Sequence, residues 1–285
     1  MGDRYELLAV LAAAIPLRIP LVHVSGGEIT EGALDEQVRH AMTKAAHIHF
    51  VANEIFARRL ARMGEEDWRI HVTGDPALDR VRRADVGSRE DLETLVGLPI
   101  GRETVMVAFH PVTNSPERTW REWEVIEAAL EDYGDSVVVT GSNADPQGNE
   151  LCRRQKAWCA AGPDRRFIEH LGQRNFLGML VAGGCLVGNS SAGIWEAPSV
   201  GAPAVNIGSR QKGRLRGTNV LDLLDPTAEA TRAAISEALT PQFRQRLEGA
   251  PSPYGDGRAA GRIVPVLRAL PEYEKLLTKR FNDEN

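Results

Sequence analysis

Short apolar runs alternate with amphipathic segments along most of the chain, and this alternation limits the fold more than any other feature. The runs at 21–24, 47–51 and 68–72 read as strands, and the segments at 34–46 and 53–63 between them read as helices. Consecutive strands that are joined by helices run parallel in one sheet. The first part of the chain therefore predicts an α/β domain.

A second alternating series of the same kind occupies the chain from residue 104 onward. Its first run, at 104–109, is apolar almost throughout, which is typical of a parallel strand buried on both faces. The fold class that we predict is α/β, with a parallel sheet in each of two domains. The predicted strands of this second series are 104–109, 136–140, 185–187, 203–207 and 219–222, and its predicted helices are 117–132, 147–161, 172–182, 227–239, 241–248 and 257–270.

Changes in composition suggest where the domains begin and end. We expect residues 1–82 to form the C-terminal part of a first domain and residues 100–254 to form the second. A polar stretch from Arg80 to Arg102 joins the two. We expect the helices within 255–285 to pack back toward the first domain, and the charged last dozen residues to be frayed.

The first domain is predicted to be incomplete. It opens on a loop and a helix at 5–15 and has at most three strands. A doubly wound domain normally begins with a strand–helix–strand unit. We therefore expect a fragment or a wrongly assigned start, and a first sheet whose uncovered edge destabilises the domain.

The composition argues against several classes of protein. The 285 residues carry a net charge of −5, whereas nucleic-acid binders usually present a basic face. The three cysteines, Cys152, Cys159 and Cys185, have no Cys-x-x-Cys spacing, which disfavours a disulfide framework and a zinc site. No long apolar run opens the chain, so we expect no signal peptide, no membrane span and a cytoplasmic location.

The strongest local signal for ligand binding is the segment 188–193, Gly-Asn-Ser-Ser-Ala-Gly, between the apolar run at 185–187 and a predicted helix. Small residues let the main chain approach an anion, and helix N–H groups with the hydroxyls of Ser190 and Ser191 can bind one. Ser and Asn are also common helix caps, so phosphate binding and simple capping remain equal alternatives. The spacing does not fit the Gly-x-Ser-x-Gly elbow of serine hydrolases.

Polar residues after other predicted strands are further candidates. His110 follows the run at 104–109 and Asn143 follows the run at 136–140, at the sheet edge where parallel sheets bind ligands. His110 can donate to a phosphate or move a proton near neutral pH, and a structural role is equally open. Glu196 could bind a ribose diol, although a solvated helix glutamate is the simpler interpretation.

Acidic residues gather on loops and at one helix start near the beginning of the chain. Such carboxylates are suited to acid–base chemistry, although Asp35 and Glu36 also fit the ordinary preference of acids for a first helical turn. His47 and His49 share one face of a strand, but without a third ligand nearby a metal site is disfavoured. The acidic candidates are Asp3, Glu28, Asp35 and Glu36.

Together these motifs resemble one family, the UDP-N-acetylglucosamine 2-epimerases. Each motif is weak alone, but they occur in the order and with the spacings of that family from residue 2 to about residue 265. The Gly-Gly-Glu form at 26–28 and the turn at 188–193 are similar to the hydrolysing branch of sialic-acid and legionaminic-acid synthesis. The matching segments are 2–4, 23–28, 35–40, 110–111, 143–145, 188–191, 207–214 and 253–257.

The resemblance implies two Rossmann-like domains in the GT-B arrangement, with a UDP-sugar as substrate. Where many members carry a catalytic glutamate after the His-Val pair, this chain has Ser25; either Glu28 takes over that duty, or the substrate differs, or activity is impaired. The implied catalytic residues are Asp3, Glu28, Asp35, Glu36 and His110. The implied UDP-binding residues are His110, Ser190, Ser191 and Arg210 at the diphosphate, Arg4 near it, Glu196 at the ribose and Asn143 near the nucleotide.

The implied reaction is an elimination followed by a hydration. A base removes the proton at C2 while UDP leaves from C1, and water and a proton then add to the glycal to release N-acetylmannosamine or an analogue. This route needs no metal and no nicotinamide cofactor, and family members tend to form homodimers. The alternatives are a non-hydrolysing epimerase and a UDP-binding module without turnover, while the acidic cluster disfavours a glycosyltransferase.

Overall fold

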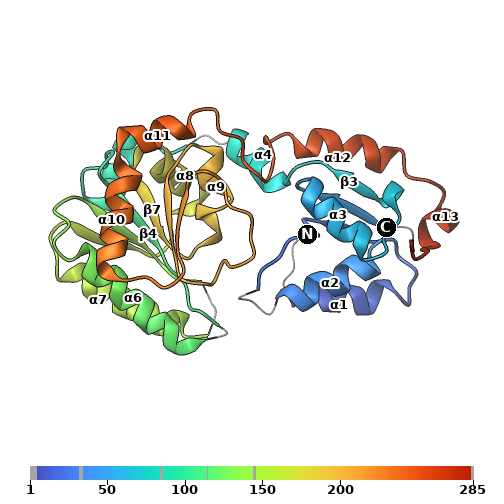
Figure 1. Ribbon diagram of the computed structural model, residues 1–285, viewed down its shortest axis with the longest axis horizontal. Helices are drawn as coiled ribbons and strands as arrows, with labels where there is room; N and C mark the ends of the chain where they lie inside the picture. The colour runs from blue at the N-terminus through green and yellow to red at the C-terminus, as the bar shows by residue number, and fades with distance from the viewer. Residues whose placement is uncertain (1–4, 32–34, 84–85, 114, 144–145, 284–285) are drawn as a thin grey trace. The chain divides into compact units, whose positions relative to one another are not determined.

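The computed structural model describes residues 5–31, 35–83, 86–113, 115–143 and 146–283. The chain divides into two compact units, each of which is described by itself (Figure 1). Unit 1 comprises Met1–Arg82 and Pro253–Asn285, and unit 2 comprises Arg83–Ser252. In the described parts of the chain, no helix combines the length and the apolar character that crossing a membrane requires.

Unit 1 contains a parallel sheet of three strands in the order β1-β2-β3. Ile48 and Phe50 of the central strand are buried together with Leu276 from the C-terminal segment. All three strands lie where the sequence predicted them. The strands are β1 (Val22–Val24), β2 (Ile48–Val51) and β3 (Ile70–Val72), and the helices are α1 (Leu7–Ala14), α2 (Asp35–Ala45), α3 (Glu54–Arg62), α4 (Pro76–Arg83), α12 (Ala259–Arg268) and α13 (Tyr273–Leu277).

Unit 2 contains a parallel sheet of six strands in the order β6-β5-β4-β7-β8-β9. The chain begins at β4, moves outward to β6, and returns to β7 on the other side of β4. Doubly wound sheets bind ligands beyond the carboxyl ends of the strands at such a reversal. The strands are β4 (Val105–Ala108), β5 (Val137–Thr140), β6 (Arg165–Ile168), β7 (Cys185–Gly188), β8 (Ala204–Ile207) and β9 (Val220–Leu223), and the helices are α5 (Arg89–Val96), α6 (Pro116–Leu130), α7 (Gly148–Ala160), α8 (Gly172–Ala182), α9 (Glu196–Ser199), α10 (Ala228–Leu239) and α11 (Pro241–Leu247).

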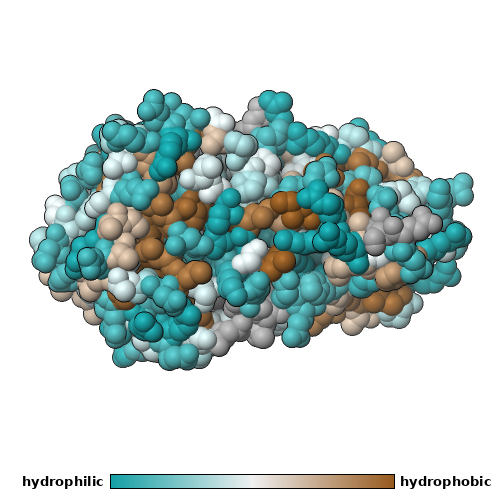
Figure 2. All heavy atoms as spheres, viewed as in Figure 1, coloured by the Kyte–Doolittle hydropathy of each residue, from teal (hydrophilic) through white to brown (hydrophobic). Residues whose placement is uncertain are grey.

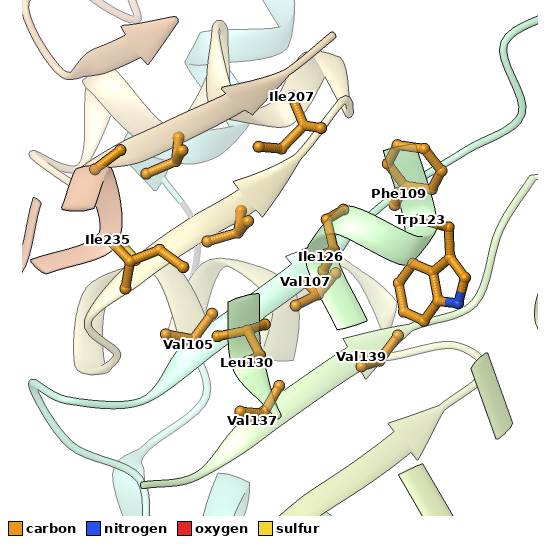
Figure 3. Close-up of a cluster of buried hydrophobic side chains, with 14 of the residues drawn as sticks. Val105, Val107, Phe109, Trp123, Ile126, Leu130, Val137, Val139, Ile207 and Ile235 are labelled. Atoms are coloured by element: carbon orange, nitrogen blue, oxygen red, sulfur yellow. The ribbon is translucent and has the colours of Figure 1, made fainter. Parts of the chain in front are cut away.

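The core of unit 2 lies where α6, α7 and α10 cover one face of this sheet. Ile126 and Leu130 of α6 lie over Val107 and Val105 of β4, and Trp123 lies beside Phe109, as Figure 3 shows. Successive strand residues point to opposite faces, and Met106 on the other face is buried as well. In Figure 1, α8 and α9 lie on the side of β7 away from α10. Because both faces are covered, the central strands read as continuous apolar runs.

Two elements of unit 2 were missed in the sequence. The edge strand β6 begins with Arg165 and Arg166, so its polar character hid it. The stretch from 80 to 102 was predicted to be a polar connection, but it contains α5, which Ser88 caps by accepting a hydrogen bond from Asp91 N at 3.1 Å. A serine cap with two acidic residues in the first helical turn is an ordinary helix start.

The prediction that the last dozen residues are frayed was wrong. They include most of α13, in which Leu276 is only 6% exposed. The Arg69 guanidinium donates to the carbonyl oxygens of Leu276 at 2.9 Å and Thr278 at 2.7 Å. The charged composition of the segment could not show that the buried Arg69, which directly precedes β3, holds it in place.

Candidate functional site

The topology of unit 2 brings several predicted binding residues to one edge of its sheet. His110 follows β4, Ser142 and Asn143 follow β5, Asn189 follows β7, and Arg210 follows β8. These strands are neighbours and parallel, so their carboxyl ends lie side by side. We call these five residues, together with Ser190, the polar edge of unit 2.

Gly188 allows β7 to approach β4 closely at this edge. Its φ is 135°, and a Cβ built there would lie 2.2 Å from the carbonyl oxygen of Ala108. The two residues are register partners in the sheet. No side chain fits at this position, so the glycine of the 188–193 segment is required for strand pairing.

Asn189 links the loops that follow β4, β7 and β8 by hydrogen bonds. Its side chain accepts a hydrogen bond from His110 N at 2.8 Å and donates one to His110 O at 2.8 Å. Its own carbonyl oxygen accepts from Arg210 Nη1 at 3.3 Å and from Gln211 Nε2 at 2.8 Å. Asn189 is fully buried, so each of these groups would be costly to leave unpaired.

The hydrogen bonds of His110 define which of its nitrogens carries the proton. Nδ1 accepts from the backbone N–H of Asn143 at 3.2 Å, with the Ser142 hydroxyl 3.4 Å away. A nitrogen that accepts cannot also be protonated, so neutral His110 has its proton on Nε2. This arrangement makes Nε2 the hydrogen-bond donor of the neutral ring.

The turn at Ser190 and Ser191 differs from the expected helix start. It leads into a single 3₁₀ turn, Ser191–Gly193, and then into α9, which has four residues. Ser190 Oγ accepts from Ala192 N at 3.3 Å, which is the capping arrangement. A helix this short supplies little dipole. Anion binding here would therefore rest on local N–H and hydroxyl groups.

Arg210 and Glu196 flank this turn. The Arg210 Nε donates to Pro111 O at 3.3 Å, so its side chain spans the loops after β4 and β7. Glu196 is the first residue of α9 and is partly buried. The Arg214 guanidinium lies 5.1 Å from the centroid of the neighbouring Trp195 ring. Arg214 of the loop after β8 therefore packs on the residue that precedes Glu196 in the chain.

Unit 1 presents a strained turn at the carboxyl end of β1, residues 25–28, which we call the Ser25 turn. Ser25 has φ 66°, a left-handed conformation that costs a residue other than glycine on the order of 1–3 kcal/mol. Its hydroxyl donates to Asp75 Oδ2 at 2.8 Å, and both residues are buried. A hydrogen bond to a carboxylate contributes about 1.5–3 kcal/mol, enough to offset that strain.

Two arginines hold the rest of the Ser25 turn. Arg59 Nη1 donates to Gly27 O at 2.9 Å, and Arg39 Nη1 donates to Glu28 O at 3.1 Å. Burial lowers the pKa of Arg59, while the carboxylates of Glu36 and Glu28 oppose that shift. The same Arg39 Nη1 that donates to Glu28 O also pairs with the Glu36 carboxylate, so one guanidinium links the two residues.

Glu36 has a clear structural task in this group. It forms a short ion pair with Arg39 and accepts a hydrogen bond from Thr30 N at 2.9 Å. His40 Nε2 lies 3.4 Å from its other oxygen. The interpretation as a first-turn acid and the interpretation as part of an acid cluster are thus both compatible with its position.

Other predicted residues fall outside what the structure describes. Asp3 and Arg4 lie outside the described residues. Asp35 begins α2, but its side chain is likewise outside the description. Their proposed roles depend on the sequence alone.

The two histidines considered for a metal have other partners. His47 Nδ1 accepts from Leu21 N at 3.0 Å, and His49 Nε2 lies 3.0 Å from Glu65 Oε2. Within the described ranges, no group of three or more His, Cys, Asp or Glu side chains could hold a metal ion.

Sequence reasoning assigned no role to Asn189 or Asp75. Asn189 was part of a recognised segment, but the sequence does not show that its side chain reaches the main chain of His110. Asp75 follows β3 in the same way that His110 follows β4, so its position at a strand's carboxyl end was an available signal.

Comparison with known proteins adds independent information. The model of the UDP-N-acetylglucosamine 2-epimerase family matches residues 1–268. A Legionella pneumophila UDP-N,N'-diacetylbacillosamine 2-epimerase (hydrolyzing) is 36% identical over 281 residues, which cover 98% of this chain and 72% of that protein. A Campylobacter jejuni GDP/UDP-N,N'-diacetylbacillosamine 2-epimerase (hydrolyzing) is 34% identical over 224 residues, which cover 78% of this chain and only 58% of the relative's length.

Solved structures confirm the fold class. The crystal structure of a Neisseria meningitidis UDP-GlcNAc 2-epimerase, bound to UDP-GlcNAc, superposes with a TM-score of 0.80 at 18% identity and covers 94% of this chain and 75% of that one. At this identity the likeness supports the α/β fold of the GT-B type and nothing finer. The family model covers nearly the whole sequence and the two relatives exceed 30% identity, so the chain belongs to the UDP-N-acetylglucosamine 2-epimerase family.

Proposed function

We propose that the chain acts as a hydrolysing UDP-sugar 2-epimerase, which expels UDP and releases a free 2-epimeric sugar. The observation that carries this proposal is the polar edge of unit 2, where His110, Asn189 and Arg210 converge at the reversal of strand order. The Legionella and Campylobacter relatives are both named as hydrolysing 2-epimerases, which favours this branch.

The proposal gives the polar edge the task of binding the diphosphate. The Nε2–H of His110, the hydroxyls of Ser190 and Ser191 and the Arg210 guanidinium are donors suited to phosphate oxygens, and the family resemblance adds Arg4 to them. Negative charge grows on the leaving phosphate as the C1–O bond breaks. Donors already held in place stabilise that charge more in the transition state than in the ground state.

The proposal places the acid–base chemistry in unit 1. One of Asp3, Glu28 and Asp35 takes the C2 proton while the electron pair of the C1–O bond leaves with UDP, which forms the C1–C2 double bond. Water then adds its hydroxyl to C1, and a proton returns to the opposite face of C2. Glu28 stands in for the glutamate that relatives carry at the position of Ser25, and Glu36 supports it.

Product analysis tests the proposed reaction. The chain is incubated with UDP-N-acetylglucosamine and with UDP-N,N'-diacetylbacillosamine, and both UDP and free sugar are measured. We expect UDP release together with a free 2-epimer from one of the two. If neither UDP nor a free 2-epimer forms from either substrate, the hydrolysing proposal is wrong.

A sugar that is epimerised but stays on UDP would instead identify the non-hydrolysing reaction. A Neisseria meningitidis relative, 35% identical over 224 residues, is named a UDP-N-acetylglucosamine 2-epimerase without mention of hydrolysis, so product analysis has to separate the two reactions.

Two substitutions separate binding from chemistry in this proposal. We expect His110→Ala to raise the Kd for UDP about tenfold or more, because it removes a hydrogen-bond donor to a charged group. We expect Asp3→Asn to abolish turnover while the Kd for UDP stays unchanged. Calorimetry with UDP and a turnover assay measure both. Equal loss of UDP binding in the two variants would contradict the assigned roles.

A further inference from the structure

The Ser25 turn is held at three points by groups from three different elements. Arg59 of α3 and Arg39 of α2 donate to the carbonyl oxygens of Gly27 and Glu28, at 2.9 and 3.1 Å. At the start of the turn the holding group is a carboxylate, Asp75, which accepts from the Ser25 hydroxyl at 2.8 Å.

We propose that Asp75 is a positioning residue of the catalytic turn, which acts through the Ser25 hydroxyl to keep Glu28 in place. The inference rests on the function proposed above, since it names the support for a group that we assign to the acid–base step. It gives the serine at this position a task of its own, different from that of the glutamate it replaces.

The location of Asp75 suits this task. Asp75 is 3% exposed and lies directly before α4, where its other oxygen accepts from Ala77 N at 2.8 Å. Its backbone N–H donates to Tyr254 O at 2.8 Å, and Tyr254 is fully buried. Hydrogen bonds thus hold both the side chain and the main chain of Asp75, and the Ser25 hydroxyl donates to an acceptor whose position is fixed.

The turn itself needs such an anchor at Ser25. A serine does not favour a φ of 66°, and the two glycines that follow add conformational freedom. Gly26 cannot be replaced to stiffen the turn, because a Cβ there would lie 2.9 Å from the buried His23 ring. Without the bond to Asp75, Ser25 could relax to negative φ and shift Glu28.

An ordinary helix cap is the competing explanation for Asp75, and α4 carries a control for it. Asp79, one turn further along, is 5% exposed and accepts from the backbone N–H groups of Ala259 and Ala260, both at 2.7 Å. Asp79 is thus a buried aspartate of α4 that caps the start of α12. Its bonds do not involve the Ser25 turn.

The experiment uses three test variants, which are Ser25→Ala, Asp75→Ala and the double variant that carries both changes. Asp79→Ala is the control. We expect kcat to fall about 10- to 100-fold in the first three, as misplacement of a catalytic group does, with the Kd for UDP unchanged. The kcat of the double variant should be no lower than that of the less active single variant, because either substitution already removes the Ser25–Asp75 hydrogen bond. Asp79→Ala should lose stability but keep kcat.

Two further variants separate the hydroxyl from backbone strain and test rescue. Ser25→Gly relieves the left-handed strain but removes the hydroxyl, so we expect it to lose kcat like Ser25→Ala. Asp75→Asn should recover part of kcat, because its amide can donate to the Ser25 oxygen while its carbonyl still caps α4. Full activity in Ser25→Ala, or multiplicative losses in the double variant, would overturn the proposal.

A readout without turnover keeps this test independent of the proposed function. Amide hydrogen exchange at residues 25–28 should become faster in Ser25→Ala and Asp75→Ala but not in Asp79→Ala. If the parent chain shows no turnover, the epimerase proposal fails while the exchange rates still decide the positioning role. Unchanged exchange in both Ser25 and Asp75 variants would refute that role outright.

Discussion

At the scale of single residues, the polar edge of unit 2 depends on a side chain that pairs with main chain. The Asn189 amide meets both the N–H and the carbonyl of His110, as a neighbouring strand would. Its own carbonyl anchors Arg210 and Gln211. The geometry of His110 and Arg210 is therefore set by a residue that itself need not touch a ligand.

This arrangement predicts a large effect from an almost isosteric change, Asn189→Asp. A carboxylate cannot donate to His110 O, and leaving that buried acceptor unpaired costs about 1–3 kcal/mol. We expect lower stability and a Kd for UDP raised about tenfold or more. Asn53→Asp is the control. It removes a comparable hydrogen bond in unit 1, which the Asn53 side-chain amide donates to Pro253 O at 2.8 Å. If UDP affinity is the same in both variants, Asn189 does not organise the site.

At the scale of elements, the C-terminal segment is tied into unit 1 by buried charge. Glu65 is fully buried and receives Lys279 Nζ at 2.7 Å, Lys44 Nζ at 2.6 Å and His49 Nε2 at 3.0 Å. Lys279 also donates to Ala46 O at 2.6 Å. Burying these groups is stabilising only while their pairing is complete.

This cluster predicts that unit 1 loses stability in acid. Burial alone would raise the pKa of Glu65, but hydrogen bonds from His49, Lys279 and Lys44 outweigh it and lower the pKa from 4.5 to about 2. A lowered carboxyl pKa contributes stability above the unfolded value, here about 3 kcal/mol, which is lost as the pH falls from about 4.5 to about 2.

Burial also lowers the pKa of His49, so the unfolded chain takes up its proton first and the loss begins below about pH 6.5. Urea titrations at several pH values measure both steps. Glu65→Gln should be destabilised at pH 7 and should lack the step below pH 4.5. An unchanged acid profile in Glu65→Gln would show that other groups control it.

At the scale of the whole molecule, one surface stands out in unit 1. α1 has no charged or polar side chain, and none occurs from Leu7 to Leu17. Leu8, Val10 and Ile15 are 45%, 45% and 58% exposed. Figure 2 shows hydrophobic spheres at the lower edge of this unit, where Figure 1 places α1. A helix that is apolar all round is normally covered.

The family resemblance implies a homodimer, and an uncharged patch can pack against its own copy without like-charge repulsion, so we expect α1 to lie in the dimer interface. Analytical ultracentrifugation should show a dimer, and the double substitution Leu8→Glu with Val10→Glu should make it a monomer. Val264→Glu with Leu267→Glu, on α12 where both residues are 41% exposed, is the control and should remain dimeric. A monomeric parent chain would disprove this pairing.

Much of the fold was predictable because its signals are local. The apolar runs of β4 and β5 need only a few adjacent residues to be recognised, and burial on both faces explains them. Strand β6 was not predicted because its first two residues are arginines at a sheet edge. The order of the C-terminal segment was not predicted because it comes from contacts with Arg69 and Glu65, about two hundred residues away in sequence.

The alternation of strands and helices, the family and the residues at strand ends could all be predicted from the sequence, since each depends on neighbouring residues or on ordered motifs. How those residues are supported depends on contacts between distant parts of the chain. The bond from Ser25 to Asp75 spans 50 positions, and the bonds from Asn189 to His110 span 79. Parallel sheets place the ends of distant segments side by side, and that adjacency is a property of strand order rather than of any local pattern.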